Sequence, residues 1–307
     1  MQLSFAAPHA VASGAWVVGA LDGNALTPAA QKADKASGGA LARGLKVSKF
    51  TGKSGQVLEV LAPAALGASR ILLVGLGKGN DFDGAKAENL AAAVNGRLNT
   101  AGETAVTFEI DVPKGSRLKP GALAAHLALG AQLKSYTFNH YRTKNLDEYE
   151  PKLKTVTIAT PAVSDAKKSW TALEAVAAGM FFARDLVNEP PNVLYPAEFA
   201  RRAKANLTKL GVKVEILGEA EMKKLGMNTL LGVGQGSERE SQLVVMTWNG
   251  SRKKKDAPVA FVGKGVCFDS GGLSLKTGPG MMGMKGDMGG AAAVTGTMQA
   301  LAMRKAR

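Results

Sequence analysis

The chain has 307 residues, 46% of them hydrophobic and 21% charged, so it is long enough for two domains and is not intrinsically disordered. Its formal net charge is +14, and its single cysteine, Cys267, excludes an internal disulfide framework and fits a reducing compartment. The first lysine or arginine is Lys32, and no apolar run approaches the ~18 residues of a membrane span. We therefore expect a cytoplasmic protein with no membrane partner.

The first half of the chain alternates between strand and helix patterns. The continuous apolar run at 70–76 predicts a buried strand, and apolar residues at helical spacing over 85–94 predict a helix after it. The other predicted elements here are strands at 58–61 and 105–112, a helix at 120–133 and a strand at 155–159. This alternation favours an α/β fold with a mixed or parallel sheet covered by helices.

A charged, proline-containing stretch over 147–169 predicts a domain boundary, with one domain at 1–160 and a second at 161–307. A long helix is expected at 169–187, with Ser169 as its N-cap and the prolines of 188–192 as its stop. The elements expected after it are a helix at 197–210 opened by Pro196, a strand at 212–217, a short helix at 219–224, neighbouring strands at 243–248 and 259–262, and a helix at 289–303. The last helix begins with small residues that permit close packing.

Two features could indicate a nucleotide or nucleic-acid partner. The glycine-rich run 75–79 follows a predicted strand, but it matches neither a dinucleotide fingerprint nor a Walker A loop, and a tight turn explains it equally well. The high positive charge keeps DNA binding as an alternative function, through neutralisation of phosphates. The plainer interpretation is a dispersed basic surface, with the dense run 252–255 (RKKK) as a solvated loop tip.

Residues 262–294 carry the most informative pattern. Lys264, Asp269, Lys276 and Asp287 lie in this Gly- and Met-rich segment, in which Lys285 is the only other charged residue. Carboxylate oxygens suit divalent cations, and a nearby lysine can ligate a metal as a neutral amine or polarise a carbonyl as a cation. Surface lysines and turn-forming aspartates would explain each residue alone. Four together after a predicted strand favour a metal site.

Nucleophilic catalysis by the same segment is a weaker hypothesis. Asp269-Ser270-Gly271-Gly272 resembles the nucleophile segment of trypsin-like proteases, but that chemistry needs a histidine base. All three histidines lie in the first half of the chain, and we interpret them as ordinary surface or core residues. Cys267 also has no nearby histidine, so we interpret it as a small buried apolar residue.

The Lys/Asp segment closely resembles the first metal-binding segment of the leucyl aminopeptidase family (cytosol aminopeptidases, peptidase family M17). The resemblance rests on Lys264, Asp269, Lys276 and Asp287 with the intervening FDSGG, SLK and DMGGAA, and on residues 183–192 (ARDLVNEPPN) upstream. It covers essentially the whole chain and is strongest from residue 178 to 301. It implies a macro-domain-like α/β N-terminal domain, a linker helix and the first part of an α/β zinc-peptidase catalytic domain.

The resemblance also implies a role for each matching residue. Lys264 would be an amine ligand of the more exchangeable of two metals, Asp269 would bridge both metals, and Asp287 would bind the same metal as Lys264. Lys276 would stay cationic and polarise the scissile carbonyl, and Met284 would line the pocket for a leucine-like first side chain. All five would contact substrate. The implied cofactors are two Mn²⁺ or Zn²⁺ ions, which would activate a water nucleophile and anchor the free amine of a peptide.

One departure from the family pattern limits this expectation. The family's second motif, Asn-Thr-Asp-Ala-Glu-Gly-Arg, supplies two further metal-binding acids and an arginine that helps to hold bicarbonate, and it does not occur here. We therefore expect a C-terminally truncated fragment, inactive alone, of an enzyme whose full-length form is a homo-hexamer. A non-catalytic paralogue that ends at Arg307 remains an alternative.

Overall fold

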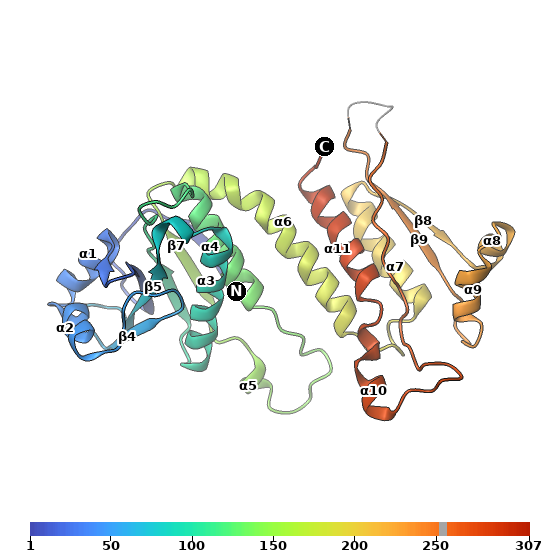
Figure 1. Cartoon of the computed structure of the whole chain (residues 1–307), viewed down its shortest axis with the longest axis horizontal. Helices are drawn as coiled ribbons and strands as arrows, with labels where there is room; N and C mark the ends of the chain where they lie inside the picture. The colour runs from blue at the N-terminus through green and yellow to red at the C-terminus, as the bar shows by residue number, and fades with distance from the viewer. Residues whose placement is uncertain (252–256) are drawn as a thin grey trace. The chain divides into compact units, whose positions relative to one another are not determined.

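The computed structural model describes residues 1–251 and 257–307, so the basic run at 252–255 lies outside the described residues (Figure 1). The chain divides into two compact units, Met1–Glu174 and Ala175–Arg307. Helix α6, which spans Val163–Asn188, passes from one unit to the other. Each unit is described separately below. No helix in the described part of the chain is both long and apolar enough to cross a membrane.

The first unit is built on a seven-stranded sheet in the order β1-β7-β6-β2-β5-β4, with β3 paired to β2. Its strands are β1 Gln2–Ala6, β2 Ala15–Leu21, β3 Ala25–Leu26, β4 Val57–Leu61, β5 Arg70–Gly77, β6 Ala105–Phe108 and β7 Thr155–Ala159. Only the pairings of β3 with β2 and of β4 with β5 are antiparallel. The expected mixed sheet in an α/β fold is confirmed.

Helices cover both faces of this sheet (Figure 1). They are α1 Pro28–Ala36, α2 Ala40–Val47, α3 Gly84–Thr100 and α4 Pro120–Lys134. The unit also contains the 3₁₀ turn η1 Gly79–Asp81 and the short helix α5 Leu146–Tyr149, which bury no residue. Leu72 and Val74 of β5 are buried in a core cluster with α3 and α4, whereas Ile71 and Leu73 are buried in a second cluster with α1 and α2. The apolar run of β5 is continuous because successive side chains enter opposite cores.

The glycines at the end of β5 and just after it allow other backbone segments to approach closely. A Cβ atom on Gly75 would lie 2.0 Å from the carbonyl oxygen of Lys53, and one on Gly79 would lie 2.0 Å from that of Lys114. Gly77 has a φ of 71°, in the left-handed region that glycine tolerates best. Packing and turn geometry therefore account for the run 75–79 without a phosphate ligand.

The strand predicted at 105–112 ends at Phe108, because the acids after it serve other contacts. Glu109 is buried and accepts hydrogen bonds from Trp16 Nε1 at 3.0 Å and Lys32 Nζ at 3.1 Å. Asp111 Oδ2 accepts a hydrogen bond of 2.8 Å from the backbone N–H of Ala29, in the first turn of α1. These side chains join the carboxyl end of β6 to α1 and to Trp16 near the start of β2.

The second unit combines helices with a small sheet. Its elements after α6 are α7 Pro196–Leu207, η2 Thr208–Leu210, β8 Lys213–Leu217, α8 Glu219–Lys224, α9 Asn228–Gly234, β9 Leu243–Thr247, α10 Gly278–Met282, η3 Gly283–Gly286 and α11 Gly289–Met303. Strands β8 and β9 pair antiparallel. Leu186, Phe199 and Met288 belong to one buried cluster, and Leu207, Val214 and Met298 belong to another.

Helices α6 and α11 approach each other at two glycines within this unit. A Cβ atom on Gly179 would lie 2.3 Å from the carbonyl oxygen of Gly296, and one on Gly296 would lie 2.3 Å from that of Gly179. The helix predicted at 289–303 and its close packing are therefore confirmed.

Two sequence predictions about local structure are wrong. Ser169 does not cap a helix, because α6 already begins at Val163 and Ser169 lies within it. Residues 259–262 do not form a strand beside β9, whose partner is β8. Val259 and Val262 are 80% and 96% exposed. An apolar run forms a strand only where a second strand pairs with its backbone N–H and C=O groups. No described strand lies beside residues 259–262.

Candidate metal and peptide site

Lys264 is held by its backbone against the start of α11. Its carbonyl oxygen accepts a hydrogen bond of 2.9 Å from Ala291 N–H. The approach is close because a Cβ atom on Gly263 would lie 2.5 Å from the carbonyl oxygen of Gly290. Neighbouring glycines therefore allow the segment before Lys264 to lie directly on the helix that follows Asp287.

Asp269 and Lys276 flank a glycine turn. Gly271 N–H donates a hydrogen bond of 2.8 Å to Asp269 Oδ1, and Lys276 N–H donates one of 2.8 Å to Ser270 O. Gly271 and Gly272 have φ values of 93° and 69°, which other residues adopt only with strain. Lys276 Nζ lies 2.6 Å from Asp269 Oδ2, so the turn brings an acid and a base into an ion pair.

Asp287 lies between η3 and α11 and pairs with Lys264. Lys264 Nζ is 2.8 Å from Asp287 Oδ2, and the lysine side chain is 58% exposed whereas the aspartate is 18% exposed. Asp287 Oδ2 is shielded from solvent, and the Lys264 ammonium is the polar group that the structure places against it. The Asp287 carboxylate therefore depends on this ammonium to balance its charge.

Electrostatic effects connect the two ion pairs. The pKa of Lys264 is raised, mainly by its contact with the Asp287 carboxylate and to a smaller degree by the charge of Asp269. The pKa of Asp269 is lowered, first by the hydrogen bond from Lys276, then by that from Gly271 N–H, and less by the charge of Lys264. The four predicted residues Lys264, Asp269, Lys276 and Asp287 thus lie within one electrostatic cluster.

The cluster offers a divalent cation two carboxylates and one amine, and the Asp287 carboxylate is largely shielded from solvent. These donors suit Mn²⁺ or Zn²⁺, and each carboxylate now carries a lysine ammonium in the place that a cation could take. Among residues 1–251 and 257–307, no three His, Cys, Asp or Glu side chains form a metal cage. The described residues therefore fit a metal as part of a donor set.

Met284 lies in η3, directly before Lys285. It is partly buried, and its carbonyl oxygen accepts a hydrogen bond of 3.2 Å from Asp287 N–H. The structure thus connects the residue expected to line a substrate pocket with an expected metal ligand. Lys285, for which the sequence pattern predicts no role, donates a hydrogen bond of 3.0 Å to the backbone oxygen of Asn188. Only its position among the site residues could have drawn attention to it.

The alternative nucleophiles have no catalytic base beside them. The second unit contains no histidine, while in the first unit His126 Nδ1 contacts Glu88 Oε1 at 2.6 Å. Ser270 Oγ makes one weak contact of 3.4 Å with Gly272 N–H. Cys267 is only partly buried, and desolvation raises the pKa of its thiol to about 11, so the thiolate is scarce at neutral pH.

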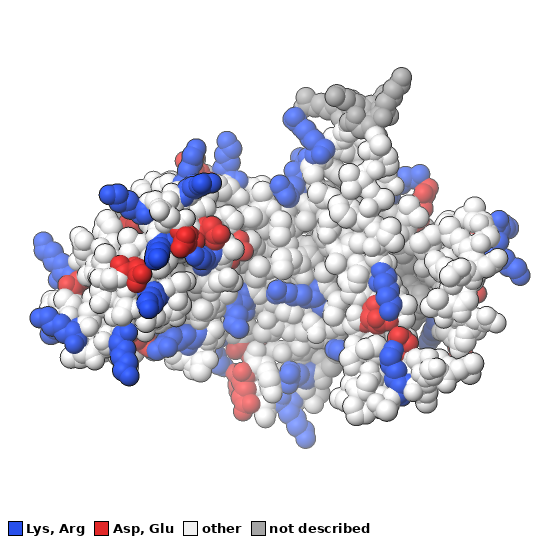
Figure 2. Space-filling model, viewed as in Figure 1, with Lys and Arg blue, Asp and Glu red and all other residues white. Residues whose placement is uncertain are grey.

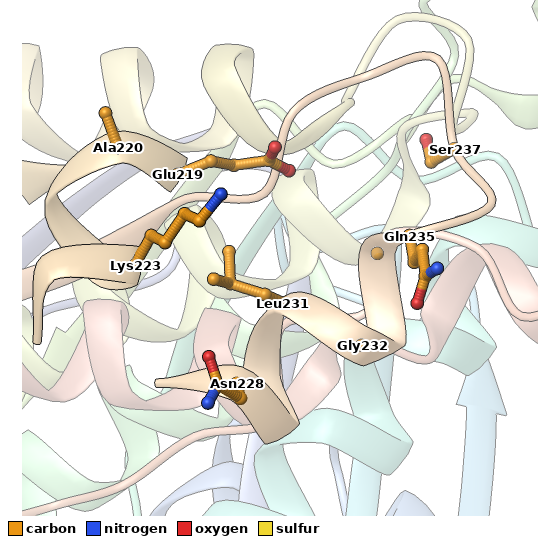
Figure 3. Close-up of a pocket in the computed structure, with 9 residues that line it drawn as sticks. Glu219, Ala220, Lys223, Asn228, Leu231, Gly232, Gln235 and Ser237 are labelled. Atoms are coloured by element: carbon orange, nitrogen blue, oxygen red, sulfur yellow. The ribbon is translucent and has the colours of Figure 1, made fainter. Parts of the chain in front are cut away.

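A cavity of about 460 Å³ lies away from these residues. It is lined by α8, α9 and the loop after α9, including Glu219, Lys223 and Gln235 (Figure 3). None of the predicted site residues lines it. The candidate site is therefore defined by converging charged groups and not by this cavity.

The basic residues form no single patch on the face shown in Figure 2. Lysine and arginine side chains are scattered there among acidic and uncharged residues. This distribution corresponds to the dispersed basic surface that the sequence allowed as the alternative to a DNA-binding track.

Comparisons with known proteins point to one family. Residues 17–145 match the sequence model of the cytosol aminopeptidase family's N-terminal domain, and residues 181–307 match that of its catalytic domain. A probable cytosol aminopeptidase of Caulobacter vibrioides is 48% identical over 299 residues, which are 97% of this chain and 59% of that protein. One of Agrobacterium fabrum is 52% identical over 275 residues, 88% of this chain and 54% of that protein.

Solved structures agree with these matches. A mutant of tomato leucine aminopeptidase superposes with a TM-score of 0.81 at 26% identity, over 99% of this chain and 60% of that one. A bottromycin maturation enzyme in complex with Mn gives a TM-score of 0.69 at 29% identity, over 94% of this chain and 56% of that one. The chain thus spans little more than half the length of these relatives, and with matches to both domains it belongs to the cytosol aminopeptidase family.

Proposed function

We propose that the protein is a two-metal aminopeptidase of the cytoplasm that releases N-terminal residues from peptides, with leucine preferred. The observation that carries this proposal is the cluster of Lys264, Asp269, Lys276 and Asp287, in which two lysine–aspartate ion pairs lie together and the Asp287 carboxylate is largely shielded from solvent. The Mn complex of the bottromycin maturation enzyme supports the choice of a divalent metal.

Three residues of the chain would hold the ions. Lys264 and Asp287 would bind one ion, and Asp269 would bridge it to a second. The ions, Mn²⁺ or Zn²⁺, supply Lewis-acid activation of water and an anchor for the substrate's amine. Because the Lys264 ammonium now pairs with Asp287, it must lose its proton before its nitrogen can ligate a metal. Further acids are required to balance the charge of two ions, and we propose that they lie outside this chain.

Lys276 would act on the substrate itself. Its ammonium donates to Asp269 Oδ2 in this structure, and it would be available for the oxygen of the scissile carbonyl if Asp269 held a metal. A cation placed there stabilises the negative charge that develops in the transition state. Met284 would pack against the first side chain of the peptide, which favours leucine. Bicarbonate as a base and a homo-hexameric assembly belong to the same proposal.

The decisive experiment uses the chain joined to the remaining part of the Caulobacter vibrioides relative. With Mn²⁺ present, we expect this fusion to hydrolyse Leu-p-nitroanilide faster than Asp-p-nitroanilide, and the 307-residue chain alone to be inactive. The variant Lys276→Met in the fusion should lose about 10²–10³-fold in kcat. A folded fusion that remains inactive with Mn²⁺ and Zn²⁺ would contradict the proposed function.

A further inference from the structure

Lys285 connects two segments that are far apart in the sequence. Its Nζ donates a hydrogen bond of 3.0 Å to the carbonyl oxygen of Asn188, which is the last residue of α6. Asn188 belongs to the segment 183–192, and Lys285 belongs to the segment that carries the metal-site residues. No salt bridge that the described structure contains includes Lys285. Its ammonium is therefore directed at a helix end and not at a carboxylate.

The end of α6 is a favourable place for this cation. The last carbonyl groups of a helix have no partner within the helix, and they carry the negative end of its dipole. No basic residue lies in the last turn of α6 itself. Lys285 therefore supplies from elsewhere in the chain the positive charge and the donor that a helix C-terminus commonly obtains from its own last turn.

The segment around Lys285 needs such an anchor. Its 3₁₀ turn η3 has only four residues and has glycine at both ends, Gly283 and Gly286. Short turns of this kind have poor hydrogen-bond geometry, and glycine gives them additional conformational freedom. Gly286 lies beside Val187 of α6, because a Cβ atom built on it would be 3.6 Å from a Val187 methyl group. The Lys285 hydrogen bond is thus the polar part of a contact between η3 and the end of α6.

We infer that Lys285 is a positioning residue, which fixes η3 on the C-terminus of α6 and thereby orients Asp287 for metal binding. Asp287 follows the turn directly, and its N–H bonds to Met284 O within it. Movement of η3 would therefore move the Asp287 carboxylate and the Met284 side chain together. The part of this inference that concerns metal binding rests on the proposed function. The contact between Lys285 and α6 does not depend on it.

The test compares Lys285→Met, which keeps the length of the side chain and removes the donors, with Lys285→Arg, which retains a cationic donor. Lys209→Met, at an exposed lysine of η2, is the matched control. Binding of Mn²⁺ is measured by electron paramagnetic resonance on the fusion with the Caulobacter vibrioides relative, with each substitution in turn. Hydrogen exchange of the backbone amides at 284–288 is measured by mass spectrometry without metal.

Lys285→Met should weaken Mn²⁺ binding about 10-fold or more, as for residues that orient metal ligands, and should speed exchange at 284–288. Lys285→Arg should restore both properties to within about threefold, and Lys209→Met should change neither. Unchanged exchange at 284–288 in Lys285→Met would overturn the inference. If the unsubstituted fusion binds no Mn²⁺, the proposed metal site fails, while the exchange data still decide whether Lys285 fixes the turn.

Discussion

Lys276 Nζ lies 2.6 Å from Asp269 Oδ2, and the turn between them is closed by the hydrogen bond from Lys276 N–H to Ser270 O. The acid and the base are therefore paired by local chain geometry. In the proposed mechanism these two groups would separate, because the Asp269 carboxylate would bind metal and the Lys276 ammonium would bind the substrate.

The first prediction concerns the pKa of Asp269. The variant Lys276→Met should raise it towards its ordinary value, because Lys276 is the main cause of the present lowering. A ¹³C NMR titration of the aspartate carboxyl groups measures this change. A titration midpoint of Asp269 that stays where it was, or falls, would show that the ion pair does not form in solution.

The second prediction concerns metal binding and stability. A metal that binds only the folded chain should stabilise it by about 2.7 kcal/mol when the metal concentration is 100 times the Kd. EDTA should reverse the corresponding rise in Tm. Asp287→Asn should abolish most of this rise, whereas Asp147→Asn, at an exposed residue of α5, should retain it. An equal rise in both variants would place the metal elsewhere.

The third prediction concerns the contact between α6 and α11. Gly296→Ala should destabilise the protein by about 1–3 kcal/mol, because the added methyl group would meet the backbone of Gly179 and the helices must separate. Gly232→Ala in α9 is the control, since nothing lies within 4 Å of its Cβ position, and it should be neutral or slightly stabilising. Urea unfolding measures both variants. Equal effects would mean that the helices are not in close contact.

The fourth prediction concerns stability at low pH. The pKa of Glu198 is lowered to about 2, first by the hydrogen bond from Arg201 and, against the opposing effect of burial, also by that from Arg202. A carboxylate with a lowered pKa stabilises the fold above its ordinary pKa of 4.5, and this contribution disappears as the pH falls towards 2.

Glu198→Gln should therefore destabilise the protein at neutral pH by less than about 1 kcal/mol, because the pairs are partly exposed. The difference from the unsubstituted protein should shrink below pH 4.5 and be nearly gone at pH 2. Urea unfolding at several pH values measures it, with Glu238→Gln as an exposed control. A difference that does not depend on pH would indicate lost packing and not lost charge.

Local sequence patterns were sufficient to predict an element where its structure depends mainly on its own residues. The strand Thr155–Ala159 and the helix Gly289–Met303 have the predicted bounds, because alternation and small-residue periodicity are properties of a single segment. The run 259–262 has an equally apolar pattern, yet it forms no strand. A strand depends on a partner elsewhere in the chain, which no local pattern reports.

The same distinction applies to the candidate site. Residue types and spacing were enough to single out Lys264, Asp269, Lys276 and Asp287, since chemistry limits which side chains can bind a cation. Which lysine pairs with which aspartate followed only from the three-dimensional structure. The contact from Lys285 to a backbone oxygen was also invisible in the sequence, because every residue has such an oxygen.

The Asp111 carboxylate has a consequence for the chemistry of the first unit. It occupies the amino end of α1, where backbone N–H groups and the helix dipole attract anions. A phosphate in solution would have to compete with an acid that is tethered there by the chain and never diffuses away. The protein thus carries its own counterion at the amino end of α1. A nucleotide phosphate could bind to these N–H groups only if it displaced the Asp111 carboxylate.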